Sequence, residues 1–138
     1  MIGHREFQPD LVIVACAISA GIHAALVPEH LAEGLGAGLG FAAAAGLLGG
    51  VAVAVTLRPH GTVLLVASAT ALAGLIGSYA LAVTTGVPVL HPEPEPVGGL
   101  AIVTKAVEAI GLLVAVRLLR RTRNATVPSL SFAKGLIP

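Results

Sequence analysis

Residues 35–57 decide the fold, and they read LGAGLGFAAAAGLLGGVAVAVTL. An α-helix needs about 20 apolar residues to cross the hydrocarbon core of a bilayer. This stretch has that length and contains no charged residue. Three further stretches are long and apolar enough to cross a bilayer, at about 11–27, 62–85 and 99–119. The sequence therefore predicts four transmembrane helices.

Composition supports a membrane protein rather than a soluble domain. Hydrophobic residues make up 56% of the 138 residues, charged residues make up 11%, and the mean hydropathy is +0.95. A soluble domain has about 25% charged residues, so this chain has too few charges to cover a water-exposed surface. The net charge of +1 does not indicate nucleic-acid binding. No Ser-His-Asp set or phosphate-binding loop is present, so an enzyme is the least supported class of function.

The basic residues predict how the chain crosses the membrane. If it crosses four times, one side receives Arg5, Arg58, Arg117, Arg120, Arg121, Arg123 and Lys134. The connections 28–34 and 86–98, on the other side, contain no Lys or Arg. Lys and Arg concentrate on the cytoplasmic side, so both termini are predicted there, in the plasma membrane. Short connections favour antiparallel neighbours, which predicts an all-α, up-down four-helix bundle as a single domain over 1–138, with a polar cytoplasmic tail at 120–138.

Small residues indicate how the helices pack. Gly36 and Gly40 form a G-x-x-x-G pair, and so do Gly46 and Gly50. Such pairs let helix backbones approach closely in lipid. We expect them to pack inside the bundle. The alternative is contact with a second copy of the chain or with a larger membrane complex.

Ionisable residues inside a membrane are costly and are therefore candidates for function. Tyr79, Lys105 and Glu108 are predicted to form an intramembrane polar cluster, with His23, Tyr79 and Lys105 at similar depth and Glu108 nearer the middle of the membrane. Lys105 and Glu108 stand three residues apart, so they can pair on one helix face, and that face must point into the bundle. Either an ion pair that fixes packing or a charge pair with a function is compatible with this pattern. Cys16, Ser19 and His23 form a second polar stripe, at helical spacing in the first span.

The non-cytoplasmic side is predicted to hold a metal site. The first connection contains Pro28, which we expect to end the first span and begin a short surface helix. The second connection contains His91-Pro92-Glu93-Pro94-Glu95-Pro96, whose alternating prolines favour a stiff, extended backbone. Imidazole and carboxylate groups suit a transition metal, copper or zinc above all. The predicted ligands are His23, His30, His91, Glu29, Glu93 and Glu95; the alternative is a solvated acidic rim.

Three classes of function follow from these patterns. The first is a membrane protein that binds a transition metal at an outward-facing site, for sensing, delivery or uptake. The second is an accessory subunit of a larger membrane complex, without chemistry of its own. The third is a small proton-coupled transporter that uses His23, Lys105 and Glu108.

Three segments also carry a family resemblance: GIHAALVPEH at 21–30, HPEPEPVGGL at 91–100 and VTKAVE at 103–108. They resemble segments of small uncharacterised actinobacterial four-helix membrane proteins. The resemblance implies the same four-span topology and suggests that these segments act as a unit. It implies no catalytic residue.

Overall fold

The computed structural model describes residues 7–59, 61–87 and 93–125, and these residues form four long helices. The helices are α1 (Phe7–Glu33), α2 (Leu35–Leu57), α3 (Thr62–Thr85) and α4 (Gly99–Ala125). Each is long and apolar enough to span a membrane. The predictions of an all-helical fold and of four candidate spans are therefore confirmed.

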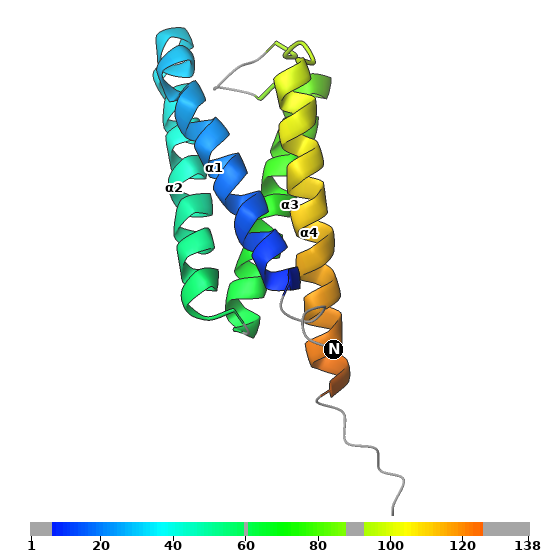
Figure 1. The fold of residues 1–138 in the computed structure, drawn as a ribbon. Helices are drawn as coiled ribbons and strands as arrows, with labels where there is room; N and C mark the ends of the chain where they lie inside the picture. The colour runs from blue at the N-terminus through cyan, green and yellow to red at the C-terminus, as the bar shows by residue number, and fades with distance from the viewer. Residues whose placement is uncertain (1–6, 60, 88–92, 126–138) are drawn as a thin grey trace, which may run out of the picture.

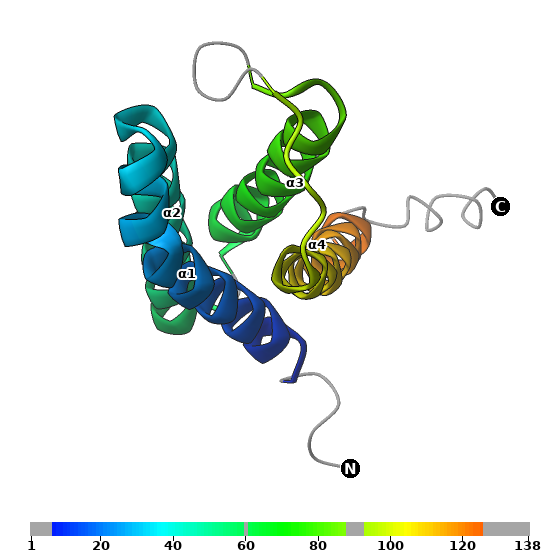
Figure 2. The same cartoon turned by 90° about the horizontal axis from the view of Figure 1, so that it is seen from above.

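The helices are arranged as two pairs, α1 with α2 and α3 with α4 (Figures 1 and 2). The pairs meet mainly where α1 packs against α4. The first residues of α1, the turn after α2 and the last turns of α4 lie at one end of the bundle, here called the terminal end (Figure 1). The junction of α1 and α2 and the segment before α4 lie at the opposite end, here called the loop end. The two pairs stand further apart at the loop end than at the terminal end.

An apolar core fills the half of the bundle nearer the terminal end. All four helices contribute to it, and its most deeply buried members are Val12, Cys16, Leu48, Val55, Leu72 and Ala115. Gly111 of α4 allows a close approach between the two pairs, because a Cβ atom there would lie 2.6 Å from Cβ of Ala15. A side chain at position 111 would therefore push α4 away from α1.

The ends of two helices differ from the predictions. α1 does not stop at Pro28 but continues through it to Glu33, so no separate surface helix forms. Proline removes one helical hydrogen bond, and the side chain of Pro28 is exposed, where its ring displaces no packing partner. α4 continues through its arginines to Ala125, so the first part of the predicted tail, 120–125, is helical. The rest of the tail lies outside the described residues.

The glycine pairs of α2 do not pack as expected. A Cβ atom added at Gly40, Gly46 or Gly50 would have no neighbouring atom within 4 Å. The close approach in this hairpin involves Gly38 instead, which lies against Leu31 of α1. The expectation of packing inside the bundle is thus wrong for these three glycines, because the hairpin turns the opposite face of α2 toward α1. All three positions are exposed.

Candidate functional site

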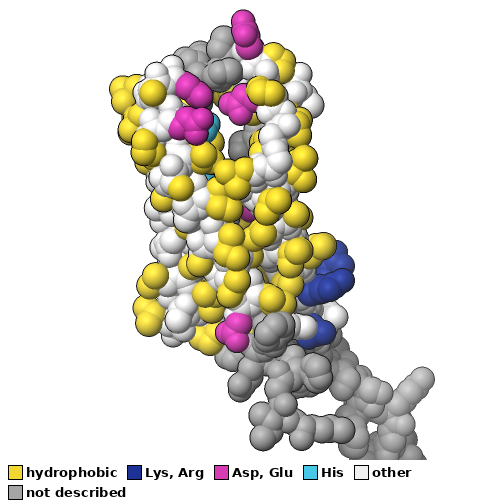
Figure 3. Space-filling view, turned by 45° about the horizontal axis from the view of Figure 1, so that its top comes forward, with side chains coloured by type: hydrophobic (Ala, Val, Ile, Leu, Met, Phe, Trp, Pro, Cys, Tyr) yellow, Lys and Arg dark blue, Asp and Glu magenta, His cyan; other side chains and the backbone are white. Residues whose placement is uncertain are grey.

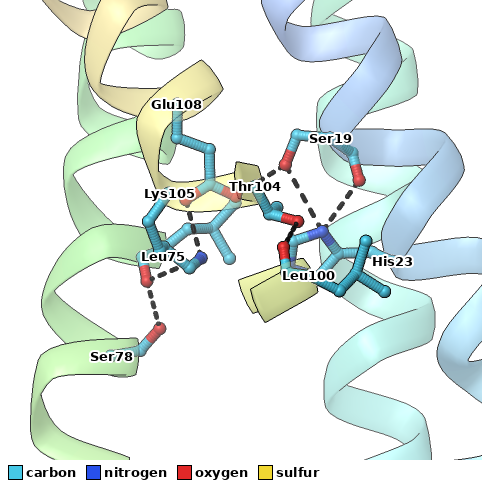
Figure 4. A network of polar contacts seen from close by, with 8 residues as sticks. All are labelled: Ser19, His23, Leu75, Ser78, Leu100, Thr104, Lys105 and Glu108. Atoms are coloured by element: carbon cyan, nitrogen blue, oxygen red, sulfur yellow. Dashed lines mark hydrogen bonds and ion pairs between the residues drawn. The ribbon is translucent and has the colours of Figure 1, made fainter. Parts of the chain in front are cut away.

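Glu108 lies at the centre of a buried polar network (Figure 4). Its side chain is fully buried, and Oε2 lies 2.6 Å from Nζ of Lys105, one turn earlier on α4. The predicted pairing of these two residues is confirmed. Thr104 and Gly111, on the same face, are also buried. The polar face of α4 therefore points into the bundle, as its spacing predicts.

The network crosses from α4 to α1 through a serine. The hydroxyl of Ser19 donates a 2.6 Å hydrogen bond to Oε1 of Glu108. Each carboxylate oxygen of Glu108 thus has a donor, one from each of two helices. Cys16, Ser19 and His23, the predicted stripe of α1, are all buried. A buried carboxylate is costly unless it is paired and hydrogen-bonded, and these two partners meet that requirement.

α3 completes the surroundings of Lys105. Its Nζ lies 3.3 Å from the carbonyl oxygen of Leu75, which also accepts a bond from Ser78. It lies 5.5 Å from the centre of the Tyr79 ring, within the range of a cation–π contact. The sequence-predicted cluster of Tyr79, Lys105 and Glu108 is therefore brought together. The buried hydroxyl of Tyr79 has no hydrogen-bond partner among the described residues.

Each of the two histidines of α1 forms a hydrogen bond with a backbone carbonyl of its own helix. Nδ1 of His23 lies 2.8 Å from the carbonyl oxygen of Ser19, and Nδ1 of His30 lies 3.0 Å from that of Leu26. A carbonyl oxygen can only accept a hydrogen bond, so Nδ1 is the protonated nitrogen in both rings. Nε2 is left as the nitrogen that can bind a metal.

Phe41 of α2 contacts both histidines. Its ring stacks on His30 with the centres 3.7 Å apart, and its centre lies 5.4 Å from that of His23. The sequence analysis did not identify Phe41. The contact could have been inferred from the α1–α2 hairpin. Because the chain reverses at Gly34, position 41 of α2 lies opposite position 27 of α1, midway between the two histidines.

Acidic side chains gather around a hollow at the loop end, and histidine atoms are visible within it (Figure 3). Glu29 and Glu33 are exposed at the end of α1. Glu93 is exposed and Glu95 half-buried in the extended segment before α4, where the amide of Glu95 donates to the carbonyl of Ala82. A negative rim attracts cations to this end of the bundle.

The predicted metal ligands are only partly placed by the structure. His23 and His30 each contact Phe41 but stand seven residues apart on α1, about 10 Å along the helix, and His23 lies ten residues before the end of α1. The carboxylates of Glu29, Glu93 and Glu95 lie at the loop end. His91 lies outside the described residues. Within residues 7–59, 61–87 and 93–125, no three His, Cys, Asp or Glu side chains stand close enough to hold a metal ion.

The basic residues in the described part of the chain lie at the terminal end, apart from Lys105. Arg58 follows α2, and the four arginines of α4 occupy its last turns (Figure 1). Arg121 donates to the side chain of Gln8 at 2.7 Å, which joins the two ends of the chain's helical part.

No family model, curated protein or solved structure matches the chain.

Proposed function

We propose that this chain is a multi-pass membrane protein that binds a transition-metal ion, copper or zinc, at the loop end, for sensing, delivery or uptake. The observation that supports it is the state of the two histidines of α1. A metal-binding histidine usually donates its second ring nitrogen to a carbonyl or carboxylate, which fixes the tautomer and ring orientation. His23 and His30 both do this through Nδ1.

The proposed ligands are Nε2 of His23 and His30, with His91 as the predicted third nitrogen ligand. Glu29, Glu93 and Glu95 would supply oxygen ligands or hydrogen bonds to the histidines. Imidazole with carboxylate suits both metals. Two Nε2 atoms alone do not make a closed site, so binding requires a further donor, from Glu29 or from the connection 86–98.

The proposal includes an orientation. With the arginines at the terminal end, the positive-inside rule places that end and both termini in the cytoplasm. The helices then run up and down through the plasma membrane, and the metal site faces outward. An outward site would meet metal ions before they cross the membrane.

The test is metal content. The protein is purified in detergent without metal, exposed to Zn²⁺ or Cu²⁺, passed over a desalting column and measured by inductively coupled plasma mass spectrometry. We expect about one bound ion in the unmodified protein and a large loss in His23→Ala, His30→Ala and His91→Ala. His60→Ala is the matched control, because in the sequence His60 belongs to the connection between the second and third spans, on the side opposite the proposed site. Equal metal content in all five proteins would contradict the proposal.

A second function has its own support, namely an accessory subunit of a larger membrane complex. Gly40, Gly46 and Gly50 offer a small-residue face of α2 that no described residue covers. Beside it, Leu47 with Ala67, Thr70, Ala71, Gly74 and Leu75 lines a groove of about 470 Å³ between α2 and α3. Native mass spectrometry after mild extraction separates the two functions: a larger complex without metal favours the accessory role.

A further inference from the structure

Glu108 is an ionisable group whose position the proposed metal site does not explain. It stands nine residues into α4 from Gly99, which at 1.5 Å per residue is about 13 Å from the loop end of that helix. Its partner Ser19 stands near the midpoint of α1. Glu108 is therefore placed deep in the apolar part of the bundle, where an ionisable side chain is expensive and rarely serves packing alone.

Among the polar side chains around Glu108, Lys105 provides the fixed positive charge that balances the carboxylate. α4 contributes Lys105, α3 contributes Tyr79, and α1 contributes Ser19 with Cys16 and His23 one turn to either side. The remaining helix, α2, has no ionisable side chain. Lys105 is thus the counter-ion of Glu108, and no second fixed charge within the described residues would hold the carboxylate ionised if the ammonium moved away.

Access to this centre is unequal from the two ends of the bundle. The side chain of Lys105 is 17% exposed, whereas that of Glu108 is fully buried behind it. One turn further toward the terminal end, Gly111 lies against Ala15 and Leu72, and the apolar core follows. Packed apolar side chains therefore close the approach to Glu108 from the terminal end, and the partly exposed Lys105 stands one turn nearer the loop end.

We infer that Glu108 is a proton-exchange site that opens to the loop end alone. A hydronium ion from the loop end transfers its proton to Oε2 of Glu108 and leaves a water molecule. Lys105, which has then lost its counter-ion, extends its flexible stem toward the exposed side. Release of the proton to water restores the ion pair. The inference goes beyond the metal site and does not require a bound metal.

Two features fit a carboxyl group that alternates between a protonated and an ionised form. Ser19 donates to Oε1, so that oxygen stays hydrogen-bonded whether or not Oε2 carries a proton. The buried hydroxyl of Tyr79, on the ring next to Lys105, is a polar group with no partner in the described part of the chain. It provides a hydrogen-bonding position for water that arrives when the ammonium moves. A fixed structural pair would also use the bond from Ser19, but it gives no role to the unpartnered hydroxyl of Tyr79.

The test uses dicyclohexylcarbodiimide, a lipophilic reagent that modifies protonated carboxyl groups inside membranes. Metal-free protein is reconstituted in liposomes and labelled, and the modified residue is located by peptide mass spectrometry. We expect labelling at Glu108, with a rate that falls as pH rises, by up to about tenfold per pH unit. No labelling of Glu108 at any pH, or a rate independent of pH, would overturn the inference.

Two controls make the result specific. Glu108→Gln should remove the modification, and Glu33→Gln, a change at an exposed carboxylate, should leave it intact. Peptide mapping of the unmodified chain gives the answer even if Glu108→Gln fails to fold. To test the direction of access, the pH inside and outside the liposomes is set separately. The labelling rate should follow the pH on the loop-end side; a rate that follows the opposite side would overturn one-sided access.

Discussion

Ser19 and Glu108 stand 89 positions apart in the sequence, and their side chains meet in a 2.6 Å hydrogen bond at the centre of the bundle. Ser19 belongs to the α1–α2 pair and Glu108 to the α3–α4 pair. Their contact is therefore a buried polar link between the two halves, which are also joined by the exposed bond from Arg121 to Gln8 and by apolar side chains. It also joins the histidine-bearing helix to the charged helix, so both proposed sites depend on how the halves dock.

Replacing Ser19 by alanine should destabilise the protein by roughly 1–2 kcal/mol, because a buried carboxylate loses one of its two donors. The matched control is Ser68→Ala. Ser68 is as deeply buried, but its hydroxyl bonds only to the carbonyl of Leu64 in its own helix. Thermal unfolding in detergent gives the comparison. An effect of Ser68→Ala as large as that of Ser19→Ala would contradict the importance of the link between the pairs.

Removing the charge of Lys105 should be more damaging than removing both charges. Lys105→Met leaves Glu108 buried without its counter-ion, which costs about 3–5 kcal/mol for a buried pair. The double variant Lys105→Met/Glu108→Gln has no uncompensated charge and should recover much of that loss. The free energies of unfolding of both single variants and the double variant form the test. Additive losses would show that the two side chains do not act as a pair.

Gly111 should tolerate no larger residue. The Cβ atom of Gly111→Ala would meet Ala15 at 2.6 Å and Leu72 at 3.1 Å, so α1 and α4 must separate. We expect a loss of about 1–3 kcal/mol from overpacking. Gly77→Ala is the control, because a Cβ at that position meets no atom within 4 Å and alanine favours a helix over glycine. Equal or greater stability of Gly111→Ala would show that the pairs are not in close contact there.

Phe41 cannot bind a metal, but its replacement should lower the metal affinity of the histidines that it contacts. Phe41→Ala removes the ring that stacks on His30 and contacts His23. If His23 and His30 bind a metal, the loss of this support should weaken affinity by roughly 10–100-fold, as changes next to metal ligands do. The measurement is competition with a chelating dye, with Leu39→Ala as an exposed control on the same helix. Unchanged affinity in Phe41→Ala would mean that the metal ligands lie elsewhere.

The orientation can be tested with single cysteines. Cys16 is fully buried and should not react with a membrane-impermeant maleimide in the folded protein. In a Cys16→Ala background, Glu33→Cys at the loop end and Asn124→Cys at the terminal end both expose a thiol. Labelling of intact cells should modify Glu33→Cys and spare Asn124→Cys. The reverse pattern would place the acidic rim in the cytoplasm.

Several features of the site could be predicted from local spacing. Lys105 and Glu108 stand three residues apart on a helix, so their pairing depends on α4 alone. The stripe of Cys16, Ser19 and His23 follows from one helix in the same way. The glycine pairs of α2 could not be assigned, because spacing shows which residues share a face and does not show what that face meets. The continuation of α1 through Pro28 was missed because proline is compatible with both a kink and a helix end.

The sequence by itself determined the four helices, since an apolar segment in lipid has few ways to satisfy its backbone groups other than a helix. It also determined that the arginines fall on one side of the four spans and that the connections 28–34 and 86–98, on the other side, hold acidic residues instead. Only the tertiary structure decided that Ser19 donates to Glu108, that Lys105 lies beside Leu75 and Tyr79, and that Phe41 joins His23 to His30. Those contacts depend on the rotation and offset of helices far apart in the chain. Side-chain packing at Gly111 and in the apolar core sets that rotation and offset, and helical periodicity does not encode them.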